Sequence, residues 1–340
     1  MKTTQRCSFS SVKLYHDEVM QTEFFSQYPS KVTKVEFVRS SLAAIPPILF
    51  QTFLKLETVD AHNSHVERVY SNTFEDAKAL KALSLRGNQI TELLADAFYG
   101  ANRLEWLDLS DNLIATVHST AFRHLSNLKT LRLNDNHISH LHSTLFDELS
   151  EMERLELQEN DLTTIGDLVF SGCPSLMFLN VSHNALKTFH LNKLDRRYNF
   201  DLIDVSHNHL EFVNIPGCLR QLYASKNDIH TVESSGTQSA LVRLKLSRNK
   251  ISSIADIPTF AKLTYLDMSY NRLNDFECSS MTRFPKLALL QLHGNQFDAS
   301  QNQLLRITVS DLFDASERCV TADKIAEGSN HYCVRNRRDS

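Results

Sequence analysis

The sequence lacks any long hydrophobic run. Its longest apolar stretch, residues 42–50, is interrupted by Pro46 and Pro47, whereas a helix needs about 20 apolar residues to cross a bilayer. We therefore expect no membrane span. Residues 1–6 also lack the apolar core of a secretory signal. Either the chain is cytosolic, or Met1 begins a chain whose signal is missing, and the second interpretation is favoured because both ends of the chain resemble extracellular caps.

An excess of charge of one sign is also absent. The 340 residues include 36 Lys and Arg against 40 Asp and Glu, a formal net charge of −4, so no nucleic-acid partner is indicated. The sequence contains no nucleophile elbow, glycine-rich phosphate loop or zinc-binding spacing. We therefore expect a protein that is not an enzyme and that uses no cofactor and no metal.

What the sequence does contain is asparagine in a recurring frame. Residues 80–88 read Leu-Lys-Ala-Leu-Ser-Leu-Arg-Gly-Asn, and further copies of this pattern end at the same residue type. The asparagines are Asn88, Asn112, Asn136, Asn160, Asn184, Asn208, Asn227, Asn249, Asn271 and Asn295. Two earlier copies carry Ser40 and Ser64 instead. The copies lie 24 residues apart, except for intervals of 19, 22 and 22 residues after Asn208.

A period of this length predicts a solenoid of leucine-rich repeats. In each copy, alternate residues face opposite sides of a short strand, so that Leu83 and Leu85 point inward and Ala82, Ser84 and Arg86 outward. The asparagine amide can donate and accept hydrogen bonds, and so form a ladder with otherwise unpaired backbone groups. The expected fold is an α/β leucine-rich repeat solenoid, or horseshoe, with a curved parallel sheet on the concave face and loops and short helical turns on the convex face.

A second column supports the same register. The residue ten positions after each of the first six ladder residues is phenylalanine, which predicts a buried aromatic spine on the convex side. The column comprises Phe50, Phe74, Phe98, Phe122, Phe146 and Phe170, followed by Leu194. The predicted organisation is an N-terminal cap at 1–31, a solenoid of about 12 repeats at 32–297, and a C-terminal cap at 298–340 with a short helix and a polar tail.

The six cysteines do not form one obvious framework. Cys173 occupies an inward apolar position, and is expected to be a buried free thiol. Cys319 and Cys333 lie close together in the predicted C-terminal cap and are the best candidates for a disulfide. The sequence leaves the pairing of Cys7, Cys218 and Cys278 open.

The order of these features resembles a known family. A cysteine-led N-terminal segment precedes the 24-residue repeats, a short repeat covers residues 208–227, and the chain ends with Asn295-Gln296-Phe297, then Cys319, then His331-Tyr332-Cys333. This arrangement resembles the mosquito leucine-rich immune proteins and, more distantly, Toll-like receptor ectodomains. Ala299, Cys333-Val334 and the end at Ser340 depart from that family's cysteines and coiled coil, so the resemblance is to a coil-less type.

The resemblance implies a secreted, non-catalytic protein of insect haemolymph with a role in innate immunity. Its expected partner is a complement-like thioester protein, another leucine-rich immune protein or a microbial surface ligand. The alternative is an intracellular adaptor that mediates protein–protein interaction.

Outward strand residues are the predicted binding surface, because such a scaffold displays its variable side chains there. Aromatic residues and arginine are enriched in binding hot spots, although any repeat strand must expose some side chains, and the flanks and caps are alternative surfaces. The predicted contacts are Arg86, Trp106, Asp108, Arg132, Arg154, Glu156, Phe178, Tyr223, Arg243, Lys245 and Tyr265. Asn180, in Asn180-Val181-Ser182, is the candidate for glycosylation on this face.

The residue before each ladder asparagine forms one further column. From Asp111 to Arg248 this column changes from acidic to basic, with His183 and His207 between. One hypothesis is a pH-responsive histidine patch. The favoured interpretation is a solvated loop edge.

Overall fold

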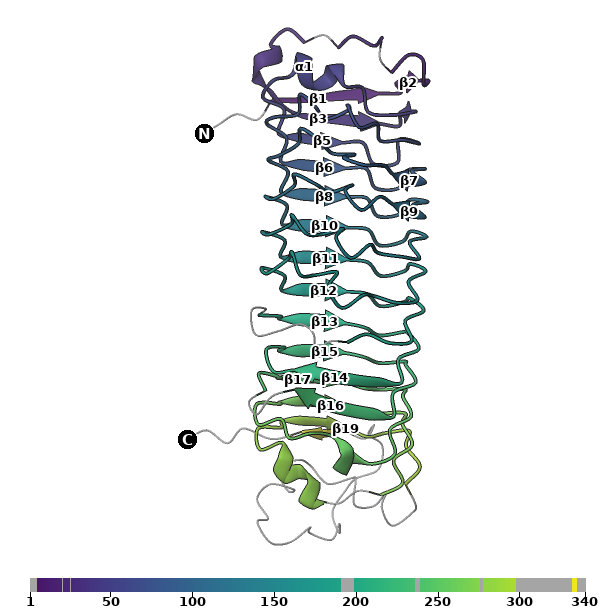
Figure 1. The fold of residues 1–340 in the computed structure, drawn as a ribbon, viewed down its shortest axis with the longest axis vertical. Helices are drawn as coiled ribbons and strands as arrows, with labels where there is room; N and C mark the ends of the chain where they lie inside the picture. Colours follow the sequence, from purple (N-terminus) through teal and green to yellow (C-terminus); the bar gives the residue numbers. More distant parts are fainter. Residues whose placement is uncertain are drawn as a thin grey trace. The chain divides into compact units, whose positions relative to one another are not determined.

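The computed structural model describes residues 5–19, 21–24, 26–190, 199–235, 239–275, 278–297 and 332–334. The chain forms two compact units, residues 1–180 and 181–340, and each is described by itself. Both contain a sheet of short parallel strands, one strand per repeat (Figure 1). The predicted leucine-rich repeat solenoid is thereby confirmed.

The first unit begins with β1 (Gln5–Ser10), which pairs in parallel with the first repeat strand, β3. The order of hydrogen-bonded strands in this unit is β1, β3 (Val32–Val38), β5 (Thr58–Asp60), β6 (Ala82–Ser84), β8 (Trp106–Asp108), β10 (Thr130–Arg132), β11 (Arg154–Glu156) and β12 (Phe178–Asn180). Two small parallel pairs lie outside this sheet, β2 (Lys13–Leu14) with β4 (Ser41–Leu42) and β7 (Glu92–Leu93) with β9 (Thr116–Val117). Helical segments are α1 (Ile48–Thr52) and the 3₁₀ turn η1 (Pro29–Lys31).

The second unit continues the same pattern. Its sheet strands are β13 (Leu202–Asp204), β15 (Gln221–Tyr223), β17 (Arg243–Lys245), β18 (Tyr265–Asp267) and β19 (Leu289–Gln291), and β20 (Tyr332–Val334) pairs antiparallel with β19. A second parallel pair is formed by β14 (Phe212–Pro216) and β16 (Thr231–Ser235). Among its described residues, the helical segments are the 3₁₀ turns η3 (Ile254–Asp256) and η4 (Cys278–Arg283). The predicted helix and polar tail of the C-terminal cap lie outside the described residues.

Turns, rather than helices, form most of the outer arcs, since α1 is the one α-helix among the residues that the structure describes. The phenylalanine column lies beneath these arcs. Neighbouring rings from Phe50 to Phe170 have centroids 5.5, 5.6, 6.0, 6.2 and 6.2 Å apart, and each ring is at most 2% exposed. Successive rings therefore pack one against the next in a continuous apolar core. Leu194 lies outside the described residues.

Asn136, which is 6% exposed, makes the complete set of hydrogen bonds of the asparagine ladder. Its Oδ1 accepts from the Ile114 N–H of the preceding repeat at 2.9 Å. Its Nδ2 donates to the Leu109 carbonyl of that repeat at 3.0 Å and to the Leu133 carbonyl of its own repeat at 3.1 Å. The same three kinds of bond recur at Asn88, Asn112, Asn160, Asn208, Asn227, Asn249, Asn271 and Asn295. Asn184 is half-buried, and its Nδ2 donates to the Val181 carbonyl at 3.1 Å.

The two serines at ladder positions have different contacts. The Ser40 hydroxyl accepts from the Val12 N–H at 3.2 Å and donates toward the Phe9 carbonyl at 3.4 Å, and so continues the ladder into the N-terminal segment. Among the described residues, the Ser64 hydroxyl donates to the His62 carbonyl alone, at 3.1 Å. In that repeat the backbone carbonyl of Ser64 itself accepts from the Leu42 N–H at 2.8 Å.

A left-handed residue precedes every ladder position, and the sequence analysis did not anticipate it. The φ angles at this position run from +50° to +73°. The residues are Arg39, Asn63, Gly87, Asp111, Asp135 and Glu159 in the first unit and His183, His207, Lys226, Arg248, Tyr270 and Gly294 in the second. Gly87 and Gly294 are the sequence signal for this conformation, because glycine adopts it without steric cost. The left-handed turn at the end of each strand therefore depends on the position in the repeat and not on which residue occupies that position.

Candidate binding surface

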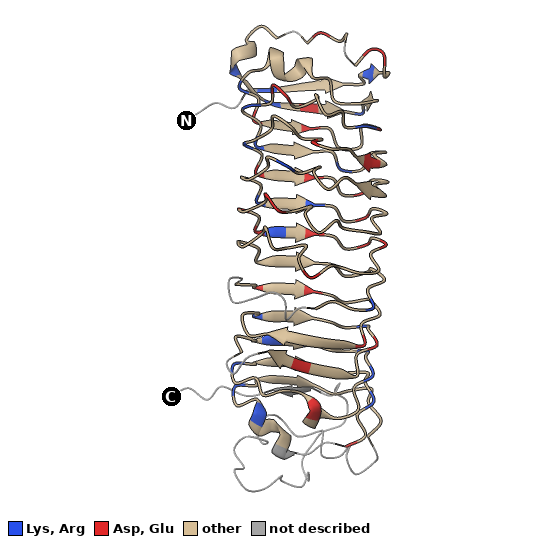
Figure 2. Ribbon diagram, viewed as in Figure 1, with Lys and Arg blue, Asp and Glu red and all other residues tan. Residues whose placement is uncertain are grey.

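The outward side chains of the sheet strands form what we call the open face of each unit. In β6, β10 and β12 the middle residue is buried while its two neighbours are half-buried, as expected when alternate residues face the core and the solvent. Acidic and basic residues are interspersed along both units (Figure 2). The sheet strands of the first unit carry charges of both signs, among them Asp60, Asp108, Arg132, Arg154 and Glu156.

An aromatic and guanidinium network occupies the open face of the first unit. The Arg132 guanidinium lies 5.8 Å from the centre of the Trp106 ring, and the Arg154 guanidinium lies 3.6 Å from that of Phe178. Glu156 joins the two arginines, with its Oε1 2.5 Å from Arg154 Nε and 3.6 Å from Arg132 Nε. Cation–π contacts and ion pairs thus fix one aromatic ring at each end of the network.

Asp108 and Glu156 differ from the other predicted contact residues because they are only 3% and 8% exposed. Asp108 Oδ1 accepts from the Ser110 N–H at 3.0 Å and from its hydroxyl at 2.5 Å, and Oδ2 lies 3.5 Å from Arg132 Nη1. These two carboxylates are therefore largely covered by the groups that they hold in place, and their role as partner contacts stays a prediction.

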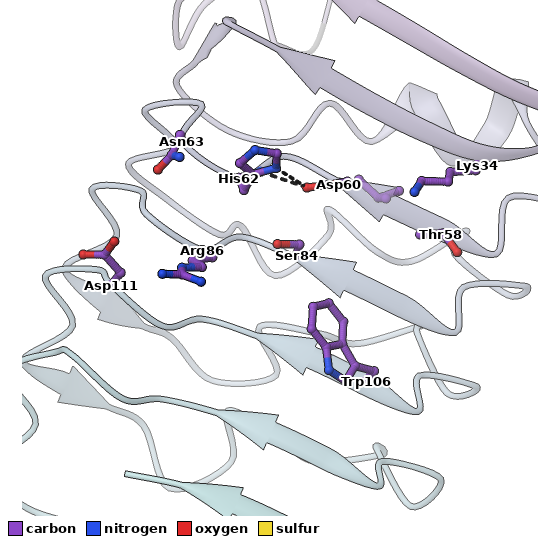
Figure 3. A pocket seen from close by; sticks show the side chains of 10 residues that line it. Lys34, Thr58, Asp60, His62, Asn63, Ser84, Arg86, Trp106 and Asp111 are labelled. Atoms are coloured by element: carbon purple, nitrogen blue, oxygen red, sulfur yellow. Dashed lines mark hydrogen bonds and ion pairs between the residues drawn. The ribbon is translucent and has the colours of Figure 1, made fainter. Parts of the chain in front are cut away.

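A hollow of about 470 Å³ lies beside Trp106 on the same face. Its lining comes from β3, β5, β6 and β8 and from the turns that follow them. Figure 3 shows Trp106 on one side of it and Lys34 on another, with Arg86 and Asp111 at the turns. Of these, only Arg86 and Trp106 were predicted as contact residues. The sequence signal that could have predicted the hollow is the small size of the outward residues Ala82 and Ser84, in the strand next to Trp106.

The remaining predicted contacts lie on the open face of the second unit. The Lys245 ammonium is 4.0 Å from the centre of the Tyr223 ring, and the Arg243 guanidinium is 5.2 Å from that of Tyr265. The Tyr265 hydroxyl donates to Gln291 Oε1 at 3.2 Å. The structure thus brings these four predicted residues together in two aromatic and cationic pairs. Asn180, the glycosylation candidate, is half-buried at the end of β12, where it is the register partner of Glu156.

Other predicted features are placed as follows. The His183 and His207 rings stack with centroids 3.7 Å apart, and their pH response stays a hypothesis.

Cys173 is a buried free thiol, as predicted, and Cys7 forms no disulfide. Cys319 lies outside the described residues, and so does the side chain of Cys333. Within the described part of the chain, no cluster of three or more His, Cys, Asp or Glu side chains could hold a metal ion, and no helix has the length and apolar character of a membrane span.

The repeat strands, the asparagine ladder and the aromatic spine define a leucine-rich repeat protein. Sequence comparison refines this assignment: the chain belongs to the BspA-type leucine-rich repeat family, whose profile matches residues 3–113 and 67–190 in six copies and so covers more than half of the chain. A second leucine-rich repeat profile matches residues 239–297. Proteins with these repeats are typically non-enzymatic and bind other proteins.

Individual proteins show how far the similarity extends. Human fibromodulin is 30% identical over 132 residues, which are 29% of this chain and 35% of fibromodulin, so the match spans about a third of that relative. The leucine-rich repeat domain of mosquito APL1 superposes with a TM-score of 0.64 at 22% identity, over 88% of this chain and 80% of that domain. A leucine-rich repeat protein of Leptospira interrogans gives 0.66 at 19% identity, over 90% and 88%. At such identities the structures show the shared fold alone.

Proposed function

We propose that this protein is a secreted, non-catalytic recognition protein of innate immunity, of the kind found in insect haemolymph. Its fold is that of the APL1 leucine-rich repeat domain, and the LRIM1/APL1C complex superposes with a TM-score of 0.54 at 21% identity, over 92% of this chain and 47% of the matched chain. The short repeat at 208–227 and the ending around Cys333 add support from the sequence. The proposed partner is a complement-like thioester protein, with another leucine-rich immune protein or a microbial surface as alternatives.

The aromatic and guanidinium network on the first open face is the observation that carries the binding role. Trp106 and Phe178 are large apolar side chains among charged residues, and each contacts an arginine that is ion-paired with Glu156. Rings fixed before binding lose little conformational freedom when a partner covers them, and tryptophan and arginine dominate binding hot spots. We therefore place the protein interface on this network.

The test is a pull-down from insect haemolymph with the purified chain as bait, followed by mass spectrometry. Trp106→Ala is expected to lower recovery of the specific partner at least tenfold, the effect of losing a hot-spot residue worth about 2 kcal/mol or more. Tyr99→Ala provides a matched control, because Tyr99 is an aromatic residue, 47% exposed, outside the sheet strands. Equal recovery with both variants would move the interface away from the network, and recovery of a thioester protein would decide the partner.

An intracellular adaptor is the second candidate, and the thiol of Cys7 favours it. Cys7 forms no disulfide in the structure, as is usual for cysteines in a reducing compartment. A thiol count in denaturant without reductant separates the two functions. Six free thiols would indicate the intracellular adaptor, whereas fewer than six would indicate disulfide formation and the secreted protein.

A further inference from the structure

The hollow beside Trp106 is distinct from the proposed protein interface in both shape and chemistry. The network of Arg132, Glu156 and Arg154 lies on strands β10 and β11, on one side of Trp106. The hollow lies on the other side, over β3, β5 and β6. Three interstrand spacings of about 4.8 Å give it a length of roughly 14 Å, and its volume of about 470 Å³ is within the range of small-molecule sites.

Charges of both signs line the hollow. Lys34 and Arg86 contribute two positive charges, and Asp60 and Asp111 contribute two negative charges. Lys34 is already paired with Glu36 at 2.7 Å. The remaining charges, Arg86 against Asp60 and Asp111, are of both signs, so the hollow has no cationic cluster that would select an anion, and its lining is compatible with a neutral ligand.

The hydrogen-bonding groups are numerous and mostly unused. The side chains of Arg86 and Asp111 and the hydroxyls of Thr58 and Ser84 make no hydrogen bond or ion pair to any described residue. Asp60 Oδ1 accepts from His62 Nδ1 at 2.7 Å, which orients the carboxylate and leaves Oδ2 available. Donors and acceptors that line the same hollow complement a ligand whose groups each donate and accept, as hydroxyls do.

Trp106 supplies the apolar wall of the hollow. It is half-buried and is the only tryptophan in the chain. An indole face packs against apolar C–H groups while the surrounding polar side chains hydrogen-bond the rest of the ligand. A sugar ring combines an apolar C–H face with a rim of hydroxyls, and few other neutral ligands do.

We propose that this hollow binds a neutral saccharide, the terminal hexose or N-acetylhexosamine of a glycan. The indole of Trp106 stacks on the ring, and Arg86, Asp60 and Ser84 hydrogen-bond its hydroxyls. This site adds a ligand class to the proposed protein-binding role and does not rest on it, since no residue of the hollow except Trp106 belongs to the network.

Trp106 makes the test direct, because all tryptophan fluorescence of the chain comes from this one residue. The purified full chain is titrated with glucose, mannose, galactose and N-acetylglucosamine, and with N-acetylglutamate as an anionic probe. A saturable change in emission with at least one sugar, in the millimolar range expected for an open site, and none with N-acetylglutamate, is the expected result. No saturable change with any of the four sugars, or saturation with N-acetylglutamate alone, would overturn the proposal.

Three variants locate the binding. Arg86→Ala changes an exposed residue and is expected to weaken sugar binding about tenfold or more, as loss of a charged hydrogen bond should. Ser84→Tyr fills the hollow without removing Trp106, and is expected to abolish the response. Tyr99→Ala, at an exposed aromatic residue outside the sheet strands and outside the network, is the control and should leave sugar affinity unchanged. An unchanged affinity in both Arg86→Ala and Ser84→Tyr would place the sugar elsewhere and refute the assignment, whatever the haemolymph pull-down gives.

Discussion

Replacing Asn136 with alanine tests the ladder on which the whole register depends. The side chain makes four hydrogen bonds, so a simple sum would predict a very large loss of stability. The three carbonyls that Asn136 Nδ2 reaches all keep another donor, however. Leu109 O also accepts from Asn112, Leu133 O from Asn160, and Asn134 O from the Asp111 N–H. Only the buried Ile114 N–H loses its sole acceptor.

The expected cost is therefore that of one orphaned buried donor, a decrease of about 1–3 kcal/mol in the free energy of unfolding. Ser64→Ala is the matched control at an equivalent position. Within the described part of the chain, the Ser64 hydroxyl bonds to the His62 carbonyl alone, and the Leu42 N–H remains paired with the Ser64 backbone. Because no donor is orphaned, that substitution should cost about 0.5–1.5 kcal/mol, the net value of one ordinary hydrogen bond.

Urea unfolding followed by circular dichroism and by Trp106 fluorescence would measure both variants. The two signals should be compared because repeat proteins can unfold in more than one step. If Asn136→Ala costs no more than Ser64→Ala, the ladder amides do not satisfy the backbone in the way described, and the reasoning fails.

Two further predictions concern the core. Phe122→Ala removes a ring that is 1% exposed and lies between Phe98 and Phe146, so it should lower the free energy of unfolding in urea titrations by about 3–5 kcal/mol. The control, Leu113→Ala, changes a residue that is 45% exposed and should alter that free energy by less than about 0.5 kcal/mol. Similar losses in the two variants would contradict the stacked spine. Burial, with a smaller contribution from Asp147, raises the pKa of the Cys173 thiol from 9.0 to about 12, so its contribution to stability is complete below pH 9 and is lost as the pH rises towards 12. The wild type should lose more stability than Cys173→Ala over that interval, and an equal loss would contradict the assigned burial.

Periodicity made most of the fold predictable, because each ladder asparagine and each spine phenylalanine occupies one position per repeat. The left-handed residue before each ladder position was missed since ten of its twelve occupants are not glycine, and such residues rarely adopt that conformation. The outward direction of Asp108 and Glu156 was predicted correctly from strand alternation. Their burial was not, because it depends on Arg132, one strand away from each of them.

The position of an outward side chain is set by the backbone ladder and only in part by its own contacts. The amides of Asn112 and Asn136 are buried, and they pair backbone groups whichever residues the strands display. Substitutions at Trp106 or Arg86 should therefore change recognition without unfolding the repeats. Glu156 is the exception, because its removal would leave Arg132 and Arg154 without their shared carboxylate on a crowded face. A loss of binding in a Glu156 variant could therefore come from the lost contact or from a change in the arginine positions. Substitution of Trp106 does not remove this carboxylate, so it is the cleaner test of the proposed interface.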